Sequence, residues 1–241
     1  MTRDEAVKRL VVALDTADRP QAQAWVEALR GSAGVFKVGL EAFTALGPAF
    51  VEWLVGQRCK VFLDLKLHDI PHTVERAARA CARLGVFMLN VHAAGGRDMM
   101  VAAREGAEAG TPPGQAAPLV LAVTLLTSLD EKALEELQLP GPPRQRVHLW
   151  ARLARDAGLA GVVCSAKELS FLRPALPPPF VLLTPGIRPQ GAQAGDQKRI
   201  ATPAEAIRQG ADYLVVGRPI TGAPDPKAAA EGILAEMVQA C

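Results

Sequence analysis

The sequence predicts a single (β/α)8 barrel, the TIM-barrel fold of the α/β class, with residues 1–241 forming one domain. Short apolar runs rich in β-branched residues alternate with longer amphipathic stretches, which is typical of parallel strands joined by crossover helices. Eight runs of each kind can be delimited, and eight strands close such a barrel. The length of 241 residues also fits, because α/β barrels commonly reach roughly 250 residues as one unit.

The expected strands are short apolar runs, as buried parallel strands usually are. They cover residues 10–14, 35–38, 60–65, 87–92, 119–124, 161–164, 180–183 and 213–216. The expected helices are the amphipathic stretches that follow them, at residues 20–29, 41–55, 74–84, 98–108, 144–157, 166–172, 203–209 and 226–239.

A doubly wound open sheet is the alternative architecture. A dinucleotide-binding fold of that kind needs Gly-x-Gly-x-x-Gly after its first strand, and the sequence has no such motif there. The Pro- and Gly-rich segments 111–118, 139–143 and 174–179 are short and fall between expected elements, so they predict surface loops within one domain. The longer polar segment 184–199 follows the seventh strand, where many barrels carry a mobile loop over a phosphate.

Composition favours a small ligand over a polymer or a membrane. A net charge of +2 is too small to suggest a nucleic-acid or membrane partner, so a bound anion should be held by local geometry. The cysteines Cys59, Cys81, Cys164 and Cys241 form no Cys-x-x-Cys pair, which favours free thiols over a disulfide or a zinc site. Acidic residues at the N-terminus and the lack of an 18-residue apolar stretch lead us to expect a soluble, cytoplasmic protein.

Charged residues concentrate where the third expected strand ends, in the run 62–71. Strand side chains alternate between faces, so Asp64 and Lys66 should point the same way out of an otherwise apolar strand. A structural ion pair would be the simplest explanation, but buried pairs stabilise weakly because desolvation offsets much of the Coulomb gain. With Asp69 just beyond and Lys37 ending the adjacent strand, a reaction site is the better interpretation.

The motif Asp64-x-Lys66-x-x-Asp69-Ile70-Pro71-x-Thr73 resembles the signature of the orotidine 5′-monophosphate decarboxylase family in its bacterial, monofunctional form. The resemblance covers nearly the whole chain and includes Leu14-Asp15, Lys37-Val38-Gly39, Asn90-Val91-His92-Ala93, Val123-Thr124-Leu125-Leu126-Thr127-Ser128, Val163-Cys164-Ser165, Thr184-Pro185-Gly186-Ile187-Arg188-Pro189 and Val216-Gly217-Arg218-Pro219. Leu67 and His72 depart from the Phe and Asn of relatives, but neither position carries the charge pattern.

The resemblance implies decarboxylation of orotidine 5′-monophosphate to uridine 5′-monophosphate in pyrimidine biosynthesis, with no cofactor and no metal. Lys66 would stabilise the carbanion at C6 and protonate it, and Asp64 would face the substrate carboxylate. Lys37 and Asp69 would complete the alternating charges. Family members place the second aspartate in the partner's site, so the resemblance also implies a homodimer with shared sites.

The resemblance assigns substrate contacts as well. Asp15 and Lys37 correspond to ribose contacts, with Thr73 contributed by the other subunit. Thr127 and Ser128 correspond to contacts with the pyrimidine. The phosphate contacts correspond to Arg188, Gln197, Gly217 and Arg218.

Two other functions are compatible with this pattern. One is a sugar-phosphate decarboxylase or aldolase of the same barrel group, which keeps Asp-x-Lys-x-x-Asp but uses Mg²⁺. The other is a non-catalytic barrel that binds nucleotide phosphates. Such a protein would typically have lost one of the four charged residues, and all four are present here.

Overall fold

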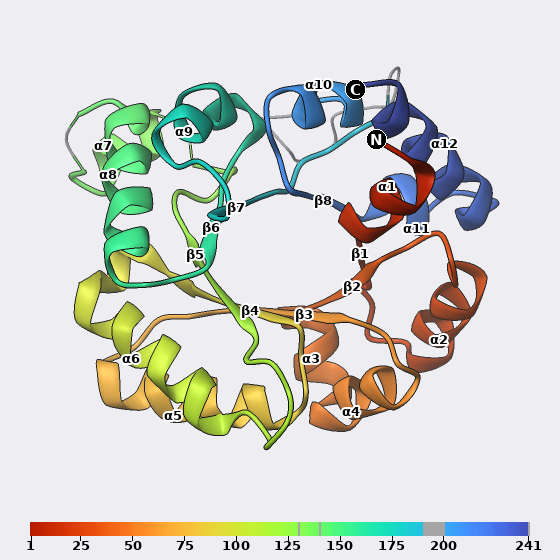
Figure 1. The fold of residues 1–241 in the computed structure, drawn as a ribbon, viewed down its shortest axis with the longest axis horizontal. Helices are drawn as coiled ribbons and strands as arrows, with labels where there is room; N and C mark the ends of the chain where they lie inside the picture. The colour runs from red at the N-terminus through yellow and green to blue at the C-terminus, as the bar shows by residue number, and fades with distance from the viewer. Residues whose placement is uncertain (130, 140, 190–200, 241) are drawn as a thin grey trace.

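Eight parallel strands close into a barrel in which each strand pairs with the next along the chain and the last pairs with the first (Figure 1). The computed structural model of the chain describes residues 1–129, 131–139, 141–189 and 201–240. Helices surround the ring of strands, as Figure 1 shows. The predicted (β/α)8 barrel is therefore confirmed.

The strands agree with those expected to within two residues at each end. They are β1 (Leu10–Ala13), β2 (Val35–Gly39), β3 (Val61–Leu67), β4 (Met88–His92), β5 (Leu119–Val123), β6 (Gly161–Val163), β7 (Val181–Thr184) and β8 (Tyr213–Val216).

The helices include three that the sequence pattern did not predict, namely α1, α7 and α11. In chain order they are α1 (Arg3–Arg9), α2 (Arg19–Ala28), α3 (Leu40–Leu46), α4 (Pro48–Gly56), α5 (Pro71–Arg83), the 3-10 turn η1 (Ala93–Gly95), α6 (Gly96–Gly110), α7 (Glu131–Glu136), α8 (Pro143–Asp156), the 3-10 turn η2 (Ala166–Glu168), α9 (Leu169–Ala175), α10 (Pro203–Arg208), α11 (Arg218–Thr221) and α12 (Pro226–Gln239).

One predicted helix is wrong. Residues 41–55 form two helices, α3 and α4, rather than one. Gly47 adopts a φ of 68°, outside the helical region, and Pro48 has no N–H to continue a helical ladder. Together they end α3 and start a new helix, α4, and the apolar periodicity of the segment does not indicate this break.

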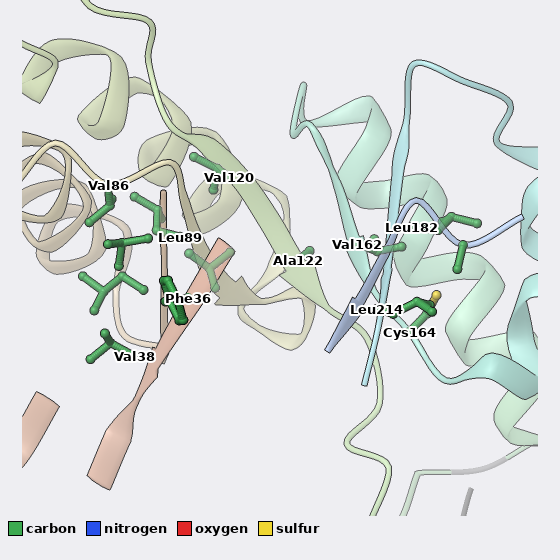
Figure 2. Packing of buried hydrophobic residues seen from close by; sticks show 14 of the residues in the cluster. Phe36, Val38, Val86, Leu89, Val120, Ala122, Val162, Cys164, Leu182 and Leu214 are labelled. Atoms are coloured by element: carbon green, nitrogen blue, oxygen red, sulfur yellow. The ribbon is translucent and has the colours of Figure 1, made fainter. Parts of the chain in front are cut away.

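The core has two layers separated by the strands. Alternate strand side chains point outward and pack against the helices, among them Phe36, Leu89 and Ala122 in Figure 2. The intervening residues, including Val35 and Phe62, fill the inside of the barrel. The same alternation sets which residues reach the end of the barrel where a ligand can bind.

Helices α5 and α6 lie side by side at the edge of the barrel (Figure 1) and contact each other unusually closely. A Cβ atom at Gly106 would lie 2.1 Å from the backbone oxygen of Glu75, and one at Gly110 would lie 2.2 Å from that of Arg79. Both distances are far below a van der Waals contact, so the two helix backbones touch only because positions 106 and 110 have no side chain.

We expect Gly106→Ala to lower the free energy of unfolding by about 1–3 kcal/mol, the usual cost of overpacking. The matched control is Gly232→Ala, in a helix position where nothing lies within 4 Å of the added Cβ. That substitution should stabilise the protein by up to about 1 kcal/mol, because alanine favours helix more than glycine. Urea unfolding of both variants checks this expectation, and equal stabilities would contradict it.

Cys59, Cys81 and Cys164 are free thiols, as predicted, and Cys241 lies outside the described residues. Burial raises the pKa of the Cys81 thiol to about 11. In the part of the chain that the structure describes, every helix is too short or too polar to span a bilayer.

Candidate active site

A cavity of about 490 Å³ lies at the carboxyl ends of the strands, where barrels bind their ligands. Eight of the residues predicted for the site line it: Asp15, Lys37, Asp64, Lys66, Thr127, Arg188, Gly217 and Arg218. The remaining lining residues are Ala13, Glu41, Phe62, Val123, Leu125, Leu126, Val163, Cys164, Leu183, Pro185, Gly186 and Val215. The lining is therefore partly apolar, and its charged groups come from several different strands and the turns that follow them.

Strand β3 carries Asp64 and Lys66, the two residues at the centre of the predicted site. Phe62 belongs to the inner layer of the core, whereas Leu63 and Leu65 pack in the outer layer. Asp64 and Lys66 continue the inward phase that Phe62 begins, so both side chains enter the cavity. The predicted shared face of Asp64 and Lys66 is confirmed.

Four charged side chains form a chain of alternating sign across the cavity. The amine of Lys37 donates to Oδ1 of Asp15 at 2.9 Å and lies 3.4 Å from Oδ2 of Asp64. The amine of Lys66 donates to Oδ1 of Asp64 at 2.7 Å. Each lysine amine therefore contacts a carboxylate, and Asp64 lies between the two amines.

Lys37 is nearly buried, with 8% of its surface exposed. Burial alone would lower the pKa of its amine, but the carboxylates of Asp64 and Asp15 outweigh that effect and the net pKa is raised. Gly39 leaves space for this arrangement, because a Cβ there would lie 2.8 Å from the Lys37 amine. Lys37 is thus a fixed positive charge at neutral pH.

The backbone of β3 is irregular at Lys66. Leu63 pairs with Leu89 and Leu67 pairs with Val91, so four residues of β3 advance along two residues of β4. Within this bulge Lys66 has a φ of 53°, a left-handed conformation that costs a non-glycine residue about 1–2 kcal/mol. Bulges are common beside active sites, and in this one the side chain of Lys66 stays on the cavity side with Asp64.

Asn90 on β4 is a site residue to which the sequence interpretation gave no role. Its Nδ2 donates to Oδ1 of Asp64 at 2.7 Å, and its Oδ1 accepts from the backbone N–H of Lys66 at 2.8 Å. The side chain is almost fully buried, at 1% exposure. A polar residue at an inward position between the apolar residues Leu89 and Val91 is the signal that could have identified it.

Two arginines line another part of the cavity. Arg188 is largely buried, and its backbone N–H donates to the carbonyl of Ala201 at 3.0 Å. Burial, and then the positive charge of Arg218, lower the pKa of the Arg188 guanidinium. Two guanidiniums that repel each other in this way form a good site for an anion carrying more than one charge.

Four predicted site residues do not line the cavity as the structure describes it. Asp69, Thr73 and Ser128 are exposed outside it, and Oδ1 of Asp69 accepts from the Ile70 N–H at 2.6 Å. Gln197 lies outside the described residues, as does most of the predicted phosphate loop. Their assigned roles stay predictions.

Among the residues that the structure describes, no group of three or more His, Cys, Asp and Glu side chains is arranged to hold a metal ion.

The chain resembles characterised proteins along almost all of its length. The profile of the orotidine 5′-phosphate decarboxylase / HUMPS family matches residues 8–233. The orotidine 5′-phosphate decarboxylase of Moorella thermoacetica is 53% identical over 242 residues, covering 98% of this chain and 95% of that protein. That of Pseudoalteromonas atlantica is 50% identical over 225 residues, covering 93% and 96% respectively.

Solved structures give the same result. The crystal structure of orotidine 5′-phosphate decarboxylase from Lactobacillus acidophilus superposes with a TM-score of 0.85 at 40% identity, covering 95% of this chain and 98% of that one.

Proposed function

Because the chain belongs to the orotidine 5′-phosphate decarboxylase / HUMPS family, we propose that it converts orotidine 5′-monophosphate into uridine 5′-monophosphate and CO2 in pyrimidine biosynthesis. The observation that carries this proposal is the row of alternating charges formed by Asp15, Lys37, Asp64 and Lys66 in the cavity. A mononucleotide requires a positive site for its phosphate and a separate site for its reacting base, and this cavity offers both kinds of group.

Lys66 is the proposed proton donor. Loss of CO2 breaks the bond between C6 and the carboxyl carbon and leaves the electron pair on C6. The Lys66 ammonium stabilises that pair and then transfers a proton to C6, after which water reprotonates the amine. Two unit charges 4 Å apart interact by about 4 kcal/mol at an effective dielectric of 20, so a fixed ammonium can do what an organic electron sink does elsewhere.

Asp64 has two proposed tasks. It holds the Lys66 amine, to which it is bonded at 2.7 Å. It also places a negative charge beside the substrate carboxylate, a repulsion that is relieved as neutral CO2 leaves. Lys37, bonded to Asp15 and close to Asp64, places a fixed positive charge beside both carboxylates.

The rest of the cavity suits the remainder of the nucleotide. We assign Asp15 and Lys37 to the ribose hydroxyls, and Thr127 with Ser128 to the pyrimidine. We assign the phosphate to Arg188, Gln197, Gly217 and Arg218. This last assignment is supported by the fold, since barrels often bind phosphate with the loops after the seventh and eighth strands and the start of a short extra helix, which is where α11 begins.

A homodimer with shared sites is the proposed assembly. Asp69 and Thr73 are exposed beside the mouth of the barrel rather than inside their own cavity. Large apolar side chains are exposed at the starts of two helices that follow β2 and β3, with Ile70 just before α5 at 67% and Leu40 in α3 at 57%. Exposed apolar groups of this size favour contact with another protein surface. We further infer a cytoplasmic enzyme without nucleic-acid or membrane partners.

A direct assay separates this function from the Mg²⁺-dependent alternative. The near-ultraviolet absorbance of orotidine 5′-monophosphate should fall when the purified protein is added without metal, and the rate should be unchanged by EDTA. A rate that EDTA abolishes and Mg²⁺ restores would favour the sugar-phosphate group of barrels. Binding of uridine 5′-monophosphate with no turnover would indicate a non-catalytic binding protein.

A further inference from the structure

We propose that Asn90 is a positioning residue for this reaction, because its amide fixes both the backbone of Lys66 and the carboxylate of Asp64. The inference rests on the proposed function and adds a residue to it. Asn90 is also the only asparagine in the 241-residue chain. Its presence at this position is therefore not explained by a high asparagine content of the chain.

The bulge in β3 creates the need for Asn90. Between the pairs Leu63–Leu89 and Leu67–Val91, the regular ladder of backbone hydrogen bonds from β3 to β4 is interrupted. The N–H of Lys66 falls in this gap and would lack a partner in the sheet. The side-chain oxygen of Asn90 accepts from it at 2.8 Å, replacing the missing backbone carbonyl.

The same amide bonds the partner of the reacting amine. Nδ2 of Asn90 and Nζ of Lys66 both lie 2.7 Å from Oδ1 of Asp64. Asn90, Lys66 and Asp64 thus form a closed triangle of hydrogen bonds, from the Lys66 backbone through the amide and the carboxylate back to the Lys66 amine. Such a ring restricts both ends of the lysine, whose left-handed backbone would otherwise relax.

Only an amide of this length satisfies both bonds. The reversed amide would direct its NH2 at the N–H of Lys66 and its oxygen at the carboxylate of Asp64, so the orientation is unambiguous. Asn90 is 1% exposed, which leaves little room for water to replace a lost bond. Leucine or alanine loses both bonds, and aspartate keeps the acceptor but loses the donor.

The first test is Asn90→Ala, assayed with Thr124→Val as the matched control. Thr124 is 2% exposed and directly follows β5, the strand next to β4; its hydroxyl donates to the carbonyl of Val163 at 3.1 Å, so the control also removes a buried side-chain hydrogen bond. We expect Asn90→Ala to lower kcat by about 100-fold, the effect of a misplaced reacting group, with KM within about threefold of wild type. The control should keep kcat within about threefold.

The second test is Asn90→Asp, which is nearly the same size and guards against a folding defect in the alanine variant. At high pH the new carboxylate repels Asp64, whereas at low pH it holds a proton and regains the donor that Asn90 supplies. The charged and titratable groups around position 90 are Asp64 and Lys66 on β3, Lys37 on β2 and His92 on β4. The kcat of each variant is divided by the kcat of the wild type at the same pH, so that the titration of these groups, which both proteins share, drops out of the ratio. That ratio should rise about tenfold between roughly pH 8 and pH 5.5, while the ratio for Asn90→Ala stays flat.

Several results would overturn the proposal. These are a kcat for Asn90→Ala within threefold of wild type, a loss confined to KM, an equal loss in Thr124→Val, or a flat pH ratio for Asn90→Asp. Binding of uridine 5′-monophosphate by calorimetry verifies that each variant is folded. If the wild type turns over and Asn90→Ala is fully active, only the role of Asn90 is refuted. If the wild type does not turn over orotidine 5′-monophosphate, the proposed function is refuted, and the role of Asn90 with it.

Discussion

Lys66→Ala should lose turnover by about 10⁴-fold or more, because general acid catalysis contributes about 10²–10⁴-fold and a preorganised charge about 10²–10³-fold. The Lys66 amine lies in the cavity, 2.7 Å from Oδ1 of Asp64. Among the described residues that line the cavity, the other lysine is Lys37, whose amine is bonded to Asp15 and nearly buried. Steady-state decarboxylation measured by ultraviolet absorbance tests this expectation.

The matched control is Lys60→Ala. Lys60 lies just before the same strand at the other end of the barrel, exposed, with its amine 4.5 Å from the centre of the Phe87 ring. Its removal should leave kcat unchanged and cost about 0.5–1 kcal/mol of stability. Lys66→Ala should still bind uridine 5′-monophosphate, because the arginines remain. Substantial turnover in Lys66→Ala would contradict the role of proton donor.

Mixing inactive Asp69→Ala subunits with inactive Lys66→Ala subunits should restore activity. In a shared-site dimer, one site of each mixed dimer receives Lys66 from one chain and Asp69 from the other, and so regains both groups. Random exchange of subunits gives about one quarter of wild-type activity, since half of the dimers are mixed and each has one intact site. The activity is measured after the mixture has been unfolded and refolded together.

The control for this experiment is a mixture of Lys66→Ala with Asp64→Ala. Asp64 and Lys66 are hydrogen-bonded within one chain, so every site in that mixture lacks one of them. It should remain inactive. If subunit exchange is demonstrated by mass spectrometry and the first mixture also stays inactive, the shared site is refuted.

Much of the fold was predictable because it depends on local alternation. Eight apolar runs with β-branched residues define eight strands, and their inward and outward phases follow from a period of two. The helical details were less predictable. α3 and α4 share one apolar periodicity, and only the conformation of Gly47 and the missing N–H of Pro48 divide them. The short helices α7 and α11 have too few residues for a periodic pattern.

The site was predictable only as far as strand phase determines it. Asp64 and Lys66 are two residues apart, so alternation brings them to one face. The bond between Asn90 and Lys66 depends on the register between β3 and β4 and on a bulge, and neither is encoded in the spacing of apolar residues. Asp69 and Thr73 lie outside the cavity of their own chain, and a pattern within one chain does not specify what a second chain would bring to them.

The close contact between α5 and α6 connects positions 106 and 110 of α6 to the turn that precedes α5. α5 starts at Pro71, directly after the turn that carries Asp69, and its backbone meets α6 where only hydrogen atoms fit at positions 106 and 110. A displacement of either helix must therefore shift the other, and with it the turn at the mouth of the barrel. Reacting groups need to stay within about 0.5 Å of their working positions. If Asp69 acts in the reaction as proposed, we expect a change in the spacing of α5 and α6 to slow turnover without altering any residue that lines the cavity.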